Sequence, residues 1–308
     1  MNAIDRKFCA LCDELRSLNE KELYHRMRQS FERVPLQTRN NCIQFFNRFR
    51  YWGRLEPEKG IYEEIERKQA ALCQYLDQFA WLYQRLADYR SKGTLYAILN
   101  NWYCYDFAST TRAKEGLFDS YFDLDLVKCS PDEVVVDLGA YTGDSVLSYL
   151  ENYGADCYKK IYCYEITPAT FAKLQKNLAP YSAVECRCKG VSDRVGSMWL
   201  NESQGGVSAN ALAEQGTLQV PVTTLDADIA EPITLIKADI EGGEQKALLG
   251  AKQHIIDERP KLLISVYHRN EDLWQIPRMI EEFCPDYRFY LRYQGSPIYP
   301  TEIILLAL

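Results

Sequence analysis

The spacing of apolar side chains changes character near the middle of the chain. Up to about residue 107, they recur every three or four positions, which predicts helices and no strands. The longest helical run covers residues 61–90, and its apolar stripe is typical of helix packing or of a dimer surface. Asn19, with Glu22 three residues later, predicts a capped helix start. Gly93 followed by Thr94 predicts the end of one helix and the cap of the next.

Beyond Pro131, short apolar runs alternate with helical patterns. Residues 133–137 form an apolar run that ends in an acid and precedes a glycine-rich turn, which predicts a buried parallel strand feeding a helix. Further strands are predicted at 160–165, 184–191, 197–200, 218–223, 234–239, 261–267, 287–293 and 302–307, and helices at 168–178, 243–249 and 271–283. This alternation predicts an α/β fold with an open, mostly parallel sheet covered on both faces. The connection between the last two strands is too short for a helix, so the C-terminal strand is predicted to be antiparallel.

The charge distribution supports a division of the chain into two parts. Residues 1–120 carry 19 Lys and Arg against 16 Asp and Glu, whereas residues 121–308 carry 17 against 27. The two parts therefore have different surfaces. We expect a helical N-terminal region at 1–107 and a second domain at 108–308.

Composition narrows the class of protein. With 308 residues, 47% hydrophobic and 26% charged, the chain is globular, which excludes disordered, collagen-like and small disulfide-framed proteins. The net charge of −7 argues against nucleic-acid binding. The pattern contains neither an apolar run long enough to span a membrane nor a signal segment. It therefore predicts a soluble, cytoplasmic protein whose thiols are reduced. The CxxC of Cys9 and Cys12 lacks a second pair, so we interpret both as buried thiols of a helix face.

A glycine-rich segment carries the first candidate chemistry. Residues 137–144, Asp-Leu-Gly-Ala-Tyr-Thr-Gly-Asp, follow the first strand, at the sheet edge where open α/β folds bind ligands. Gly139 would let a ligand approach the backbone, and Gly143 would let the next helix pack closely. The spacing is neither GxGxxG nor a phosphate loop, which weakens the dinucleotide and triphosphate interpretations. Glu165 ends the second strand, where a carboxylate can accept both hydroxyls of a ribose.

Together with later segments, these motifs resemble the class I, Rossmann-like S-adenosylmethionine-dependent methyltransferases, and specifically the FkbM family. The resemblance covers residues 121–308 and rests on segments 135–144, 164–165, 236–244 with 247–251, and 265–268. The third segment is the most specific, because FkbM proteins carry a DxEGxE pattern there. This chain has every position of it: Asp239, Glu241, Gly242 and Glu244.

The resemblance implies S-adenosylmethionine as the cofactor and a set of residues around it. Those residues are Asp137, Gly139, Ala140, Tyr141, Gly143, Asp144, Glu165, Ser192, Asp193 and Asp239. The glycine loop would surround the methionine end, and Glu165 would hold the ribose. Ser192 and Asp193 would meet the adenine, although a polar hairpin turn explains them equally well. Tyr141 departs from the small residues common in such loops.

The ends of the fourth and fifth strands supply the candidate catalytic residues. Asp239 and His268 should lie at the same sheet edge, where either could take a proton from an acceptor hydroxyl. Glu241 and Glu244 are predicted on the first turn of the following helix, where the helix dipole favours carboxylates. Asp239, Glu241 and Glu244 could instead hold a magnesium ion, but helix chemistry explains two of them, so we expect no metal.

The expected function is therefore methyl transfer from S-adenosylmethionine to an oxygen of a hydroxylated small-molecule or glycan acceptor. The alternatives are transfer to nitrogen and a non-catalytic scaffold that keeps the fold. The N-terminal helices would pack on the second domain, form a homo-oligomer or cover the acceptor. The Gly/Ser-rich residues 201–216 are either a cover over the acceptor site or a plain surface loop.

Overall fold

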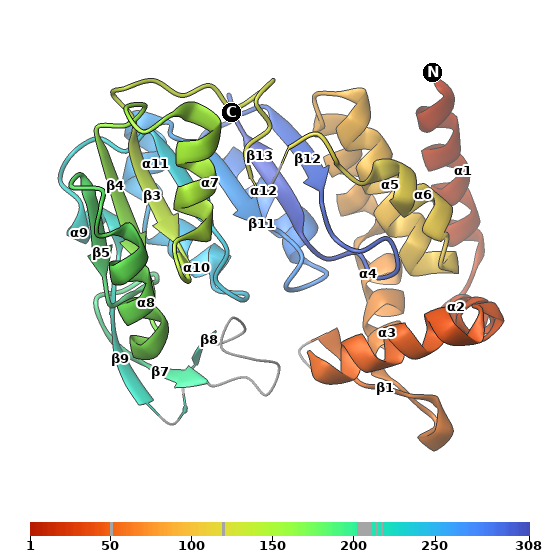
Figure 1. Cartoon of the computed structure of the whole chain (residues 1–308). Helices are drawn as coiled ribbons and strands as arrows, with labels where there is room; N and C mark the ends of the chain where they lie inside the picture. Colours follow the sequence, from red (N-terminus) through yellow and green to blue (C-terminus); the bar gives the residue numbers. More distant parts are fainter. Residues whose placement is uncertain (50–51, 119–120, 202–210, 214, 217) are drawn as a thin grey trace. The chain divides into compact units, whose positions relative to one another are not determined.

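Figure 1 shows the computed structural model of the chain, which describes residues 1–49, 52–118, 121–201, 211–213, 215–216 and 218–308. The chain forms two units. The first, called the N-terminal unit, comprises Met1–Gly116, Val266–Pro277 and Arg288–Leu305. The second, called the sheet unit, comprises Leu117–Ser265, Arg278–Tyr287 and Leu306–Leu308. A domain boundary near residue 107 stays a prediction.

Helices dominate the N-terminal unit, as the three- and four-residue spacing predicts. They are α1 (Ala3–Ser17), α2 (Glu20–Arg33), α3 (Leu36–Arg48), α4 (Glu63–Arg85), α5 (Tyr89–Cys104) and α6 (Phe107–Ala113), with the short elements β1 (Leu55–Glu56), η2 (Pro57–Lys59) and β2 (Ile61–Tyr62) between α3 and α4. The capping box at Asn19 is confirmed, because its side chain accepts hydrogen bonds from the N–H groups of Lys21 and Glu22. The antiparallel pair β1–β2 was not predicted.

The predicted helix boundary at Gly93 and Thr94 is wrong, because both residues lie inside α5. The helix begins after Asp88, whose carboxylate accepts a 2.7 Å hydrogen bond from the Ser91 N–H. Because Asp88 is the stronger N-cap, the helix begins upstream of Gly93, and the glycine lies inside the helix. A side chain at Gly93 would make only an ordinary 3.8 Å contact with Ile4.

Segments from the C-terminal part of the chain complete the N-terminal unit. Strand β12 (Phe289–Tyr293) runs beside the start of α5. The Leu291 N–H donates to the Ser91 hydroxyl at 2.9 Å, and the Arg292 guanidinium contacts the Asp88 carboxylate at 2.8 Å. Residues separated by about 200 positions therefore stabilise the same helix start. The last strand is β13 (Ile303–Ala307), and its antiparallel direction stays a prediction.

The sheet unit contains the predicted parallel strands. They are β3 (Val134–Leu138), β4 (Lys160–Tyr164), β5 (Val184–Arg187), β10 (Leu235–Ala238) and β11 (Lys261–Ser265). Within the seven-stranded order β12-β13-β11-β10-β3-β4-β5, the five neighbours from β11 to β5 all pair in parallel. Their connections contain α7 (Asp144–Tyr153), α8 (Pro168–Leu178), α9 (Leu225–Asp228), α10 (Glu244–Leu249) and α11 (Lys252–Glu258), and α12 (Asp272–Phe283) follows β11. The mostly parallel α/β architecture is confirmed.

A smaller sheet corrects two predictions. The predicted strand 184–191 is two strands, because β5 joins the large sheet whereas β6 (Gly190–Val191) joins a second sheet ordered β6-β9-β7-β8. Strands β9 (Leu218–Thr223), β7 (Gly196–Asn201) and β8 (Ala211–Ala213) complete that sheet. Because β9 lies between β6 and β7, residues 192–195 do not form a hairpin turn. Strand β8 falls within the predicted loop 201–216, of which residues 202–210, 214 and 217 lie outside the described residues.

Two predictions about the chemistry of the chain can be compared with the structure. The eleven cysteines are free thiols; Cys12 is buried as predicted, whereas Cys9 is exposed. Among the described residues, no helix has both the length and the apolar character that crossing a bilayer requires.

Candidate functional site

The glycine loop after β3 is held against two neighbouring strands. The N–H groups of Gly139 and Ala140 donate to the Tyr164 carbonyl at 3.1 and 3.0 Å. Gly139 has a φ of +77°, and a Cβ there would lie 1.9 Å from the Asp239 carbonyl oxygen. Only glycine therefore allows this approach of the loops that follow β3 and β10. Gly143 caps α7 in the left-handed region, and its Cβ would lie 3.0 Å from Leu178, which confirms the predicted close packing.

Asp137 is enclosed beneath this loop by polar partners. Its carboxylate accepts a hydrogen bond from the Ser145 hydroxyl and pairs with the Lys237 ammonium at 3.0 Å. Lys237 also donates to the Gly139 carbonyl at 3.0 Å, so one buried cation links the strand acid to the loop. Burial lowers the Lys237 pKa, but the nearby negative charges, first Asp137 and then Asp239, raise it by more. The Lys237 pKa is therefore above its ordinary value. Lys237 was not among the predicted site residues, although a lysine in the apolar strand β10 needs a buried partner.

Glu165 lies at the carboxyl end of β4, beside the glycine loop. Its carboxylate is buried and accepts a 2.7 Å hydrogen bond from the Thr167 N–H. Burial raises the Glu165 pKa, and hydrogen bonds from the backbone of Thr167 and Tyr141 oppose that shift. Tyr141 has a φ of +47°, an uncommon conformation for a tyrosine. Asp144 is exposed on the first turn of α7.

Ser192 and Asp193 have structural contacts of their own. Ser192 is buried, its N–H donates to the Thr223 carbonyl at 2.8 Å, and its hydroxyl donates to Asp193 at 3.1 Å. A Cβ at Gly250 would lie 2.0 Å from the Ser192 carbonyl oxygen, so the backbone is closely packed there. The Asp193 side chain is exposed. A role at the adenine stays a prediction for both residues.

The acidic segment after β10 differs from its prediction in one respect. Asp239 accepts a 2.6 Å hydrogen bond from the Tyr121 hydroxyl, a partner that lies 118 residues away and was not foreseen. Glu241 precedes α10 instead of lying on its first turn, and it has a φ of +56°. Gly242, with a φ of +89°, continues this turn, and the helix begins two residues later. Glu244 begins α10, is buried, and accepts a 2.8 Å hydrogen bond from the Ile240 N–H.

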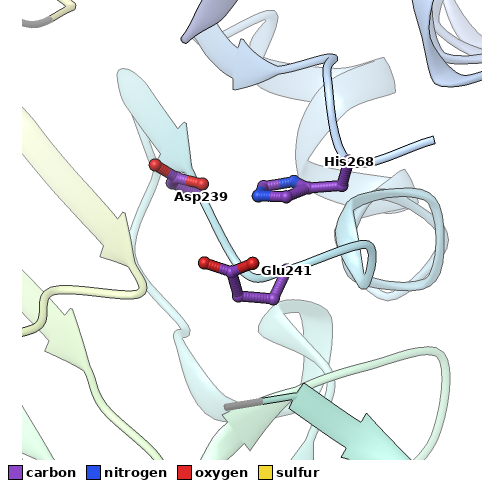
Figure 2. A group of neighbouring side chains, drawn as sticks. All are labelled: Asp239, Glu241 and His268. Carbon is purple, nitrogen blue, oxygen red and sulfur yellow. The ribbon is translucent and has the colours of Figure 1, made fainter. Parts of the chain in front are cut away.

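His268 follows β11 by three residues. It is buried, and its ring centroid lies 4.2 Å from that of Tyr267. Figure 2 draws His268 together with Asp239 and Glu241, the two acidic residues that follow β10. The carboxylates of Asp239 and Glu241 could supply ligands to a divalent cation.

The match to a protein family decides how these features are interpreted. The methyltransferase FkbM domain matches residues 137–297, just over half of the chain. The chain belongs to the FkbM family. The matched region begins at Asp137 and contains the glycine loop, Glu165, Asp239 and His268. The FkbM region also contributes Val266–Pro277 and the start of Arg288–Leu305 to the N-terminal unit, whereas helices α1 to α6 precede it.

Two relatives place this FkbM protein among known chains. It is 22% identical over 189 residues to the 2-O-methyltransferase NoeI of Sinorhizobium fredii (strain NBRC 101917 / NGR234), a similarity that covers 53% of this chain and 75% of the relative. The crystal structure of Methyltransferase FkbM from Methylobacillus flagellatus KT matches with a TM-score of 0.68 and 26% identity. That match covers 81% of this chain and 64% of the other, so the chain spans less than two thirds of that solved protein.

Proposed function

We propose that this FkbM protein transfers a methyl group from S-adenosylmethionine to a hydroxyl oxygen of a small-molecule or glycan acceptor. Membership of a methyltransferase family supports methyl transfer. The observation that carries the proposal is the buried Glu165 carboxylate beside the glycine loop, at the carboxyl edge of a parallel sheet. Transfer to oxygen is supported by the similarity to NoeI, a 2-O-methyltransferase.

The donors and acceptors of the sheet unit fit this cofactor. Glu165 offers a carboxylate for the two ribose hydroxyls. The N-cap of α7 is Gly143, which has no side chain to occupy the first-turn N–H groups, so a methionine carboxylate can bind there. When bound, S-adenosylmethionine would supply a methyl group activated by the sulfonium. The pairing of Asp137 with Lys237 fixes the glycine loop that would surround the cofactor.

His268 and Asp239 are the proposed catalytic residues. A hydroxyl acceptor must lose its proton as the bond to the methyl forms, and a neutral imidazole at His268 would take that proton. Asp239, oriented by the Tyr121 hydroxyl, would position the acceptor or serve as the base instead. Positioning alone can be worth an effective molarity of about 10⁵ to 10⁸ M, so alignment would supply much of the rate.

Calorimetry with S-adenosylmethionine tests the cofactor proposal. Glu165→Ala should weaken binding by about 1.5 to 3 kcal/mol, roughly 10- to 150-fold, because a charge-assisted hydrogen bond to the ribose disappears. Glu151→Ala is the matched control, since Glu151 is an exposed carboxylate on α7. Equal affinities in the wild type and Glu165→Ala would remove Glu165 from the site. A wild type that does not bind the cofactor would favour the non-catalytic scaffold.

Single-turnover rates test the base. His268→Ala should slow methyl transfer to a hydroxyl by about 10² to 10⁴ while cofactor affinity stays nearly the same. The wild-type rate should rise with pH as the imidazole loses its proton. An amine acceptor needs only its own neutral form, so a loss of less than a few-fold would contradict the base assignment and favour Asp239 or transfer to nitrogen.

The two carboxylates that follow β10, Asp239 and Glu241, favour a second version of the same function, in which a divalent cation would bind the acceptor oxygen. Removal of metal with a chelator, followed by addition of Mg²⁺ or Mn²⁺, separates the two versions. A rate that falls and is then restored supports the cation, whereas a rate that does not change supports the metal-free base.

A further inference from the structure

Four side chains form a row across the parallel strands of the sheet unit. In the strand registers, Asp137 of β3 lies between Lys237 of β10 and Cys163 of β4. Cys163 in turn lies beside Cys186 of β5. Residues paired in this way in a parallel sheet project from the same face. The row therefore continues the ion pair of Lys237 and Asp137 into two adjacent thiols, for which the proposed methyl transfer has no use.

The register places the two cysteines at a spacing that a disulfide can bridge. Neighbouring strands of a sheet lie about 4.8 Å apart, so residues paired across them have Cα atoms at about that distance. Disulfide-linked cysteines have Cα separations of about 4.4 to 6.8 Å. Because both side chains project from one face, their sulfur atoms can meet without a change of register. Strand β5 ends the seven-stranded order, beside β4 (Figure 1), so β4 alone holds it within this sheet.

The two thiols differ in exposure and in acidity. Cys163 is fully buried whereas Cys186 is half-buried, so an oxidant in solution meets Cys186 first. A hydrogen bond from the Cys163 thiol lowers the Cys186 pKa, and the same bond, together with burial, raises the Cys163 pKa. The thiolate is the form of cysteine that reacts, and the bond favours it at Cys186. The thiol that must react second is already beside it and needs no access to solvent.

We propose that Cys163 and Cys186 form a reversible oxidation site, which a hydroperoxide converts into a disulfide. The Cys186 thiolate attacks the peroxide, the O–O bond breaks, and an alcohol leaves once sulfenic acid has formed at Cys186. The Cys163 sulfur then attacks the Cys186 sulfur, and the sulfenic oxygen leaves as water with the Cys163 proton. In total, two thiols and one hydroperoxide give one disulfide, one alcohol and one water. With hydrogen peroxide, the alcohol is a second water.

Peptide mapping of the full chain tests the proposal, because trypsin separates the cysteines concerned. Cleavage after Lys and Arg puts Cys163 on peptide 161–173, Cys186 on peptide 177–187 and Cys188 on a third peptide. The folded chain is treated with hydrogen peroxide, its remaining thiols are alkylated, and the peptides are identified by mass spectrometry. The principal new species should be 161–173 joined to 177–187, lighter than their sum by two hydrogens. Dithiothreitol added before alkylation should abolish it.

Variants and an unfolded sample show whether the register makes the pair. Cys163→Ala should leave sulfenic acid on peptide 177–187, trapped by dimedone, because the second thiol is missing. Cys188→Ser is the matched control, since Cys188 is an exposed thiol two residues beyond Cys186, and the yield of linked peptide should equal that of the wild type. Unfolding the wild type in urea before oxidation should lower that yield several-fold, because the strands no longer hold the two thiols together.

Three results would each overturn the proposal. They are the absence of the linked peptide from the oxidised folded chain, equal yields from the folded and the unfolded chain, and a link from Cys186 to Cys188 in its place. All three come from the wild type, so the proposal can fail even if Cys163→Ala does not fold. The experiment needs neither S-adenosylmethionine nor an acceptor, and its outcome is therefore independent of the proposed methyl transfer.

Discussion

Replacing Lys237 by Met removes the cation that pairs with Asp137 and leaves a side chain of similar length. The two side chains are 5% and 3% exposed, so among the described residues the carboxylate would keep only the Ser145 hydroxyl as a partner. Removing one member of a buried pair typically costs about 3 to 5 kcal/mol. That is a large part of the roughly 5 to 15 kcal/mol by which domains are stable. With a urea slope of about 2 kcal/mol/M, the midpoint should fall by about 1.5 to 2.5 M.

The pH dependence of this loss follows from the raised pKa of Lys237. A cation whose pKa is higher in the folded protein contributes its full stability below its ordinary value of 10.5 and loses it as the pH rises through the folded value. The difference between the wild type and Lys237→Met should therefore be constant from about pH 6 to 9 and shrink only in strong alkali. Urea unfolding followed by circular dichroism at several pH values measures it.

A double variant separates the charge pair from simple loss of packing. Asp137→Asn combined with Lys237→Met removes both charges, so its destabilisation should be clearly less than the sum of the two single changes. Lys173→Met, at an exposed position of α8, is the control and should alter stability by no more than about 0.5 kcal/mol. A loss below about 1 kcal/mol in Lys237→Met, or strict additivity in the double variant, would refute the reasoning.

Three further variants test the rest of the sheet unit. Gly139→Ala should lower the unfolding free energy by more than about 2 kcal/mol, since its Cβ would lie 1.9 Å from the Asp239 carbonyl oxygen; a wild-type urea midpoint would contradict this. Glu165→Gln should keep or raise the thermal midpoint between about pH 5 and 8, because a raised pKa means that ionisation above the ordinary value of 4.5 costs stability; a clear fall would contradict this. Tyr121→Phe should cost about 1 to 3 kcal/mol in urea unfolding by removing the 2.6 Å hydrogen bond to Asp239, and an unchanged midpoint would count against that bond.

The parts of the fold that could be predicted well from the sequence depend on local patterns of residues. Strands β3, β4, β10 and β11 are short apolar runs whose carboxyl ends carry or adjoin polar residues, and a parallel sheet brings such ends to one edge. The glycine loop and Glu165 could be located for the same reason. Gly143 packs against Leu178 as its position at a strand-to-helix turn predicts.

The parts that sequence missed depend on distant partners. Residues 184–191 split into β5 and β6 because β5 pairs with β4 whereas β6 pairs with β9. The local pattern cannot specify these pairing partners. Tyr121 meets Asp239 across 118 residues, and the cap at Asp88 is reinforced by Arg292. That residues 108–308 form a separate domain stays a proposal. A fragment with these residues would have to fold without α5, the helix that packs against β12.

The N-terminal unit is built from segments that the ribosome makes at different times. Residues up to Gly116 are made first, but the unit also needs segments that end at Leu305. At about 5 to 20 residues per second, its last segment emerges roughly 10 to 40 s after its helices. The five parallel strands of the sheet unit are already complete at Ser265. The helices that leave the ribosome first therefore wait for segments that are made much later, and their apolar faces need protection from aggregation during that interval.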